Sequence, residues 1–147
     1  MINGVHEPVF TRLIRHCAQN SHGDFLIDIG ANLAHDSFDD DREAMMQRAA
    51  AAGVTTMIVT GSSDASNQRA AALAEAHPGT LYSTAGVHPH HAADYSDASD
   101  ALIRSLVENP VVVAVGCNCT PPQYADELIR RVRKAVPEKA VIAYPNS

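Results

Sequence analysis

Five short apolar segments alternate with four segments of helical periodicity over most of this sequence. The apolar segments are rich in β-branched residues and cover residues 25–29, 55–60, 81–86, 111–116 and 140–144. Apolar residues recur at helical spacing in the segments between them, at residues 39–52, 64–77, 97–109 and 121–136. Strands that alternate with helices form parallel sheets with right-handed crossovers. The sequence therefore predicts an α/β fold with about five parallel strands.

The sequence is too short for a complete barrel of alternating strands and helices. An eight-stranded barrel of this kind takes about 250 residues, and the sequence has 147. We expect a partial TIM-type barrel over residues 25–147, preceded by a helix and a linker in residues 1–24. The helix is expected at residues 7–18, and its apolar face carries Val9, Phe10, Leu13, Ile14 and Cys17.

A partial barrel leaves two edge strands, which proteins cover or pair with another chain. The helix expected at residues 7–18 is a candidate to cap one opening of the partial barrel. The alternative is a homodimer that forms through the open edge strands.

Composition narrows the class of protein. A formal net charge of -6 and a pI near 5.7 disfavour broad electrostatic binding of nucleic acid. The sequence has no apolar run long enough to cross a membrane and no secretory signal pattern at its first residues. Three cysteines without an export signal indicate reduced thiols and a cytoplasmic location.

Helix ends carry recognisable capping residues. Ser37 is a plausible cap for the helix at 39–52, whose acidic first turn, residues 39–41, either complements the helix dipole or binds a metal. Thr120 is expected to cap the last helix, with Pro121 at its first position and Gln123 completing a capping box. The basic cluster at residues 130–134 is interpreted as a solvated helix end in preference to a nucleic-acid patch.

Potential ligands follow three of the predicted strands. They are Asp28 and Asn32, then His88, His90 and His91, then Cys117 and Cys119. Because parallel strands end at one edge of a sheet, these groups are expected around a common rim, where ligands bind. Imidazole, carboxylate and thiolate are metal ligands, so a divalent ion, Mg, Mn or Zn, is predicted there.

Each of these groups also has a plainer interpretation. The loop histidines bind either nothing, a metal or a phosphate, with His88 and His91 the candidates for substrate contact. If the backbone stays extended, Cys117 and Cys119 face one way as zinc requires, and otherwise they are inert buried thiols. Asp28 is either a ligand or a cap for a loop amide.

From residue 25 to about 116 the sequence resembles the TatD-type deoxyribonucleases. The matching stretches are LIDIGANL at 26–33, AGV at 52–54, TG at 60–61, STAGVHPH at 83–90 and the strand at 112–116. The resemblance implies a TIM-type barrel, divalent metals and hydrolysis of DNA phosphodiesters. Cys117 stands where the family has a metal-binding glutamate, and Gly30 and Asn32 stand where many relatives carry a histidine pair. An incomplete metal site predicts weak or lost activity.

From residue 112 to 147 the sequence resembles homocysteine S-methyltransferases instead. The matching stretches are AVGCNCTPP at 114–122, LIRRVR at 128–133 and YPNS at 144–147. That resemblance implies that Cys119 is a zinc-binding thiolate. The family binds zinc with three cysteines, and the other two, which are paired, are missing from this sequence. Two resemblances that meet near residue 116 predict a chimeric or truncated chain, and the alternative functions are a non-catalytic zinc-binding fragment or an inactive one.

Overall fold

The sheet of this protein is parallel throughout and follows the order of the chain. The computed structural model describes residues 26–144, apart from the side chain of Asn118. Each strand pairs in parallel with its sequence neighbours, in the order β1-β2-β3-β4-β5. The strands are β1 (Leu26–Ala31), β2 (Val54–Val59), β3 (Leu81–Ala85), β4 (Val112–Asn118) and β5 (Ala140–Tyr144). The predicted α/β fold of five parallel strands is confirmed.

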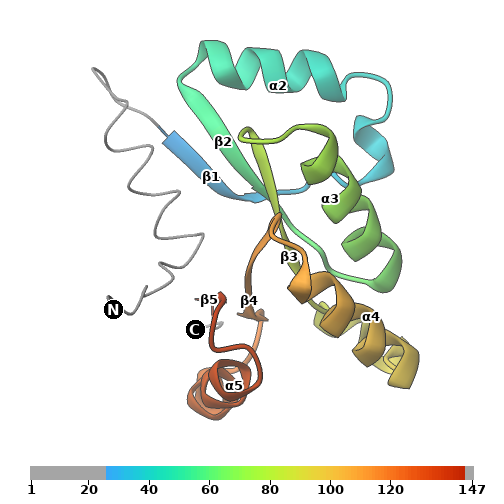
Figure 1. The fold of residues 1–147 in the computed structure, drawn as a ribbon, viewed down its shortest axis with the longest axis vertical. Coiled ribbons are helices and arrows are strands. Elements are labelled where there is room, and N and C mark those ends of the chain that lie inside the picture. Colours follow the sequence, from blue (N-terminus) through green and yellow to red (C-terminus); the bar gives the residue numbers. More distant parts are fainter. Residues whose placement is uncertain (1–25, 145–147) are drawn as a thin grey trace, which may run out of the picture.

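The helices form an arc around the sheet, and the sheet curves into half of a barrel (Figure 1). They are α2 (Arg42–Ala51), α3 (Asp64–Ala76), α4 (Asp97–Glu108) and α5 (Pro122–Ala135), with 3-10 turns η1 (Asp36–Phe38) and η2 (Pro89–Asp94). None of the described helices is long and apolar enough to cross a membrane. The helix expected at residues 7–18 lies outside the described residues.

The main core lies between the first three strands and helices α2 and α3. Met57, Val59 and Leu81 are buried there against Ala70 and Ala74. The small alanines of α3 let the helix approach the sheet closely, because they add no bulk between helix and strand. A second cluster of Ile58, Val113 and Ala114, packed with Ile142, joins β2, β4 and β5. Burial of these apolar side chains is the main term that holds the strands in place.

Some predicted boundaries are wrong by a few residues, for identifiable reasons. The last helix begins at Pro122, so Pro121 and not Thr120 holds the cap position, one residue later than predicted. Pro121 precedes another proline, which disfavours helical backbone, and it is extended at ψ 136°. Capping boxes form at Ser63 and Ser96, before α3 and α4.

Asp39, one of the acidic residues before α2, makes contacts that the sequence did not predict. The helix begins at Arg42, three residues later than expected, and Ser37 lies in η1. Asp39 accepts hydrogen bonds from Arg42 and Arg69, so it joins this turn to α3. The Arg42 guanidinium, together with Arg69, holds the pKa of Asp39 below its ordinary value.

Ser83 carries a buried hydroxyl group. It is fully buried in β3, and its Oγ makes no hydrogen bond to the residues that the structure describes. An unpaired buried polar group costs about 1–3 kcal/mol. We therefore expect Ser83→Ala to raise the free energy of unfolding by about 1 kcal/mol, measured by urea denaturation.

Ser99 provides the matched control for this substitution. It is equally buried, but its Oγ donates to Asp64 Oδ2 at 2.8 Å. Ser99→Ala is expected to lower the free energy of unfolding by about 1–2 kcal/mol, because it leaves this contact unmade. A loss of stability in Ser83→Ala would contradict the assignment of an unpaired hydroxyl.

Candidate functional site

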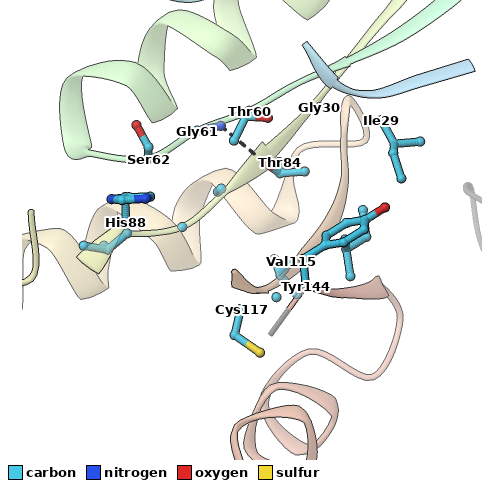
Figure 2. A pocket seen from close by; sticks show the side chains of 15 residues that line it. Ile29, Gly30, Thr60, Gly61, Ser62, Thr84, His88, Val115, Cys117 and Tyr144 are labelled. Carbon is cyan, nitrogen blue, oxygen red and sulfur yellow. Dashed lines mark hydrogen bonds between the residues drawn. The ribbon is translucent and has the colours of Figure 1, made fainter. Parts of the chain in front are cut away.

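A pocket of about 150 Å³ lies where the strands end. All five strands or the loops after them line it, and two of the predicted ligand residues, His88 and Cys117, are among the lining residues. The lining residues are Ile29, Gly30, Thr60, Gly61, Ser62, Thr84, Ala85, Gly86, Val87, His88, Val115, Gly116, Cys117, Ile142 and Tyr144. Figure 2 places Thr84 and Gly61 between His88 on one side and Tyr144 on the other.

The described lining of this strand-end pocket contains no side chain that is charged when histidine is neutral. Asp, Glu, Lys and Arg are absent from its described lining, and its ionisable side chains are those of His88, Cys117 and Tyr144. Hydroxyl groups of Thr60, Ser62 and Thr84 supply the other polar atoms. The pocket can therefore form hydrogen bonds to a ligand through hydroxyl groups and an imidazole, and the rest of its lining is apolar.

The buried amide of Asn67 holds the pocket's rim together. Asn67 is 1% exposed on α3, and its Nδ2 donates to the Gly86 carbonyl oxygen while its Oδ1 accepts from the Gly86 N–H, both at 3.0 Å. Gly61 N donates to Thr84 Oγ1 at 3.2 Å, which joins the ends of β2 and β3. These contacts fix the backbone that leads into His88.

His88 is oriented by hydrogen bonds to its backbone and ring. Its N–H donates to the Ser62 carbonyl oxygen at 2.8 Å, and its Nδ1 accepts from the His90 N–H at 3.2 Å. A ring nitrogen that accepts a hydrogen bond carries a lone pair, so neutral His88 holds its proton on Nε2. His88 in this conformation therefore offers Nε2–H as a donor to a ligand.

The predicted ligands at the first strand lie outside the pocket lining. Asp28 is exposed, and its Oδ1 accepts from the Gly30 N–H at 2.9 Å. The structure therefore favours the loop-amide interpretation of Asp28 over the ligand interpretation. Asn32 is exposed and follows β1, which extends two residues further than predicted because Ala31 pairs with Val59.

The three histidines of the second loop diverge. His90 is exposed and its ring packs edge-on against the ring of His88, with centroids 4.5 Å apart. His91 lines a second cavity, beside Asp94 and Tyr95. Desolvation and the hydrogen bond to Asp100 raise the pKa of Tyr95 above its ordinary value. Only His88 of this trio lines the strand-end pocket.

The extended backbone of β4 does not continue through both cysteines. Cys117 lies in β4 and lines the pocket, and Figure 2 shows its sulfur pointing away from His88. Cys119 lies beyond the strand with φ 55°, and its N–H donates to the Tyr144 carbonyl oxygen at 3.1 Å. The extended backbone that a paired zinc site required is interrupted at Cys119.

The residues present do not fit a catalytic metal centre. The described part of the chain contains no group of three or more His, Cys, Asp or Glu side chains placed to hold a metal ion. Mg²⁺ and Mn²⁺ prefer carboxylate oxygens, which the described pocket lining lacks. A metal bound to Nε2 of neutral His88 would require the ring proton to be on Nδ1. In this structure Nδ1 instead accepts a hydrogen bond from the His90 N–H, so it cannot carry that proton.

Several pocket residues were missed by reasoning from the sequence. Thr60 and Ser62 directly follow β2, and Tyr144 ends β5. Their positions at strand ends are the signal for all three, because ligands of parallel α/β sheets bind there, but their side chains are not typical metal ligands. Asn67 carried no signal, since a polar residue inside a helix is ordinarily exposed.

Comparisons with known proteins agree on one family. The family model described as TatD-related DNase matches residues 27–136. A 3′-5′ ssDNA/RNA exonuclease TatD of Pantoea vagans is 48% identical over 91 residues, which is 62% of this chain and 35% of that protein. The corresponding protein of Erwinia tasmaniensis is 45% identical over the same length. The chain thus spans about a third of the length of the curated relatives it matches.

Solved structures show the same relationship. The crystal structure of YjjV, a TatD homolog from Escherichia coli, superposes with a TM-score of 0.65 at 29% identity, covering 82% of this chain and 51% of that one. A TatD family hydrolase from Entamoeba histolytica, at 18% identity and a TM-score of 0.51, supports the fold alone.

The predicted methyltransferase-like segment finds no support in these comparisons. The TatD-related family model continues past residue 116, across the predicted junction, and ends at residue 136. Most of the segment at 112–147 therefore lies within the TatD match. Because that match covers most of the chain and the half-barrel has the fold of solved relatives, the chain belongs to the TatD family of DNase-related proteins.

Proposed function

We propose that this protein binds the phosphate backbone of single-stranded nucleic acid in the strand-end pocket and hydrolyses it weakly or not at all. Membership of the TatD family carries the proposal, and relatives described as 3′-5′ ssDNA/RNA exonucleases supply the substrate class. Of DNA and RNA, we propose DNA as the preferred substrate. The pocket lies at the edge of a parallel sheet where ligands of α/β proteins bind.

The pocket's donors suit a phosphate oxygen. The Nε2–H of His88 and the hydroxyls of Ser62 and Thr84 are hydrogen-bond donors, and the described lining contains no carboxylate to repel a phosphate. The net charge of -6 opposes long-range attraction of nucleic acid, so binding relies on these local contacts and is weak.

Weak hydrolysis follows from what the pocket lacks. Phosphodiester cleavage needs an activated water and stabilisation of developing negative charge. The metal that the family implies would supply both, but the described residues do not assemble a site for it. His88 is therefore proposed as a binding residue.

The proposal is tested with a labelled single-stranded DNA oligonucleotide. We expect binding, measured by fluorescence anisotropy, and little or no cleavage with magnesium or manganese added. His88→Ala should weaken binding about tenfold or more, because it removes a hydrogen bond to a charged group.

His91→Ala is the matched control, since His91 is on the same loop but lines the second cavity. It should bind nearly as the wild type does. Equal losses in the two variants would indicate a general effect of loop histidines, and unchanged binding by His88→Ala would remove His88 from the site. Metal-dependent cleavage at rates typical of nucleases would refute the weak-activity part.

The zinc-binding alternative depends on Cys117 and Cys119. Elemental analysis of the purified protein tests it: stoichiometric zinc that Cys119→Ser abolishes would favour this alternative over nucleic-acid binding. The methyltransferase-like segment, the chimeric origin, the homodimer and the cytoplasmic location stay predictions from the sequence.

A further inference from the structure

The strand-end pocket has a polar side and an apolar side. His88 and Ser62 line it where β3 and β2 end, and Ile29 of β1 and Tyr144 of β5 line it too. Figure 2 shows Ile29 and Tyr144 on the side away from His88 and Ser62. A nucleotide has the same division, with a charged phosphate at one end and a flat, aromatic base at the other.

Tyr144 presents aromatic surface to this pocket. It lines the pocket and is nevertheless 51% exposed, so about half of its surface is open to a ligand. No other Phe, Tyr or Trp belongs to the described lining. Ile29, which is 38% exposed, adds aliphatic surface on the same side. An exposed tyrosine ring at a ligand pocket suits a flat aromatic group, because two such rings stack favourably.

The backbone of Tyr144 is held in the sheet, which fixes the position of the ring's attachment. Tyr144 is the pairing partner of Asn118 in β4, and its carbonyl oxygen accepts a hydrogen bond from the Cys119 N–H at 3.1 Å. Two side-chain torsions are then the main freedom that remains. Ordering a tyrosine ring on a ligand therefore costs little conformational entropy.

We propose that Tyr144 stacks on a base of the bound single strand while a phosphate of that strand lies at His88. The inference rests on the proposed function and assigns the base contact within the same pocket. Stacking tolerates any base, because every base has a π-face. The described lining also lacks the Asp, Glu, Asn, Gln, Lys and Arg side chains that pair with base edges. The site therefore binds single strands with little preference for base sequence.

Two oligonucleotides separate the base contact from the phosphate contact. One is a labelled single-stranded DNA, and the other has the same length with abasic residues throughout. By fluorescence anisotropy, Tyr144→Leu should bind the intact strand about tenfold more weakly than the wild type and the abasic strand equally well. Tyr144→Phe keeps the ring and should bind both strands as the wild type does. His88→Ala should weaken binding of both strands, because its contact is with phosphate.

Tyr124→Leu is the matched control. Tyr124 is a tyrosine of α5 that is 59% exposed and lies outside the pocket lining. Its replacement should leave binding of both strands unchanged.

Nitration of tyrosines by tetranitromethane, read by mass spectrometry, gives a second measurement that uses the wild-type chain and does not depend on how well a variant folds. The intact strand should protect Tyr144 from nitration and leave Tyr124 as reactive as before, and the abasic strand should protect neither.

The outcomes distinguish this inference from the proposed function. Equal weakening of both strands by Tyr144→Leu, or full nitration of Tyr144 under the bound intact strand, would overturn the stacking contact and leave nucleic-acid binding in place. A wild-type chain that binds neither strand would overturn the proposed function, and the base contact with it.

Discussion

Gly116→Ala is expected to lower the free energy of unfolding by about 3 kcal/mol and to free β5 from the sheet. A Cβ at this position would overlap the backbone oxygen of Ile142, its pairing partner in β5. Backbone atoms cannot retreat as a flexible side chain does, so β4 and β5 would have to separate. Urea denaturation measures the loss, and hydrogen exchange in residues 140–144 locates it.

Gly30→Ala is the control for this substitution. A Cβ built at Gly30, on the other edge strand, has nothing within 4 Å, and Gly30 also lines the pocket. Its replacement is expected to change stability by less than about 0.5 kcal/mol. Similar effects of the two substitutions would show that the close approach of β4 and β5 is not what requires glycine at position 116.

Asn67→Ala is expected to lower the free energy of unfolding by about 3 kcal/mol and to loosen the loop that carries His88. The substitution removes both side-chain hydrogen bonds from Asn67 to Gly86. The N–H and the carbonyl oxygen of Gly86 then lose their partner. Each buried unpaired group costs about 1–3 kcal/mol. Thermal unfolding measures the loss, and hydrogen exchange in residues 86–91 reports the loosening.

Two further variants separate the hydrogen bonds from other effects of changing α3. Gln68→Ala alters the exposed neighbouring residue of the same helix and should leave stability within about 0.5 kcal/mol of the wild type. Asn67→Asp keeps the shape and can accept from the Gly86 N–H, but as a carboxylate it cannot donate to the Gly86 oxygen. It should therefore be destabilised too, and wild-type stability in Asn67→Asp would refute the two-bond assignment.

Two of the residues singled out from the sequence line the candidate pocket, and local backbone geometry explains where two others lie. Placing His88 and Cys117 at one rim required only that consecutive parallel strands end on the same edge, and both line the pocket. The expected coordination by Asp28 and Cys119 depended on local backbone geometry. Asp28 turns to the Gly30 amide, and a left-handed residue at Cys119 ends the extended strand.

Local pattern in the sequence was enough to determine the order and type of the elements, because apolar periodicity and β-branched segments set helix and strand over a few residues. The fifth strand, for example, has the predicted bounds of residues 140–144. The tertiary structure alone decided which side chains meet at the pocket. The Gly61–Thr84 and Asn67–Gly86 contacts join residues 23 and 19 positions apart, and such pairs form only once helix and sheet have packed.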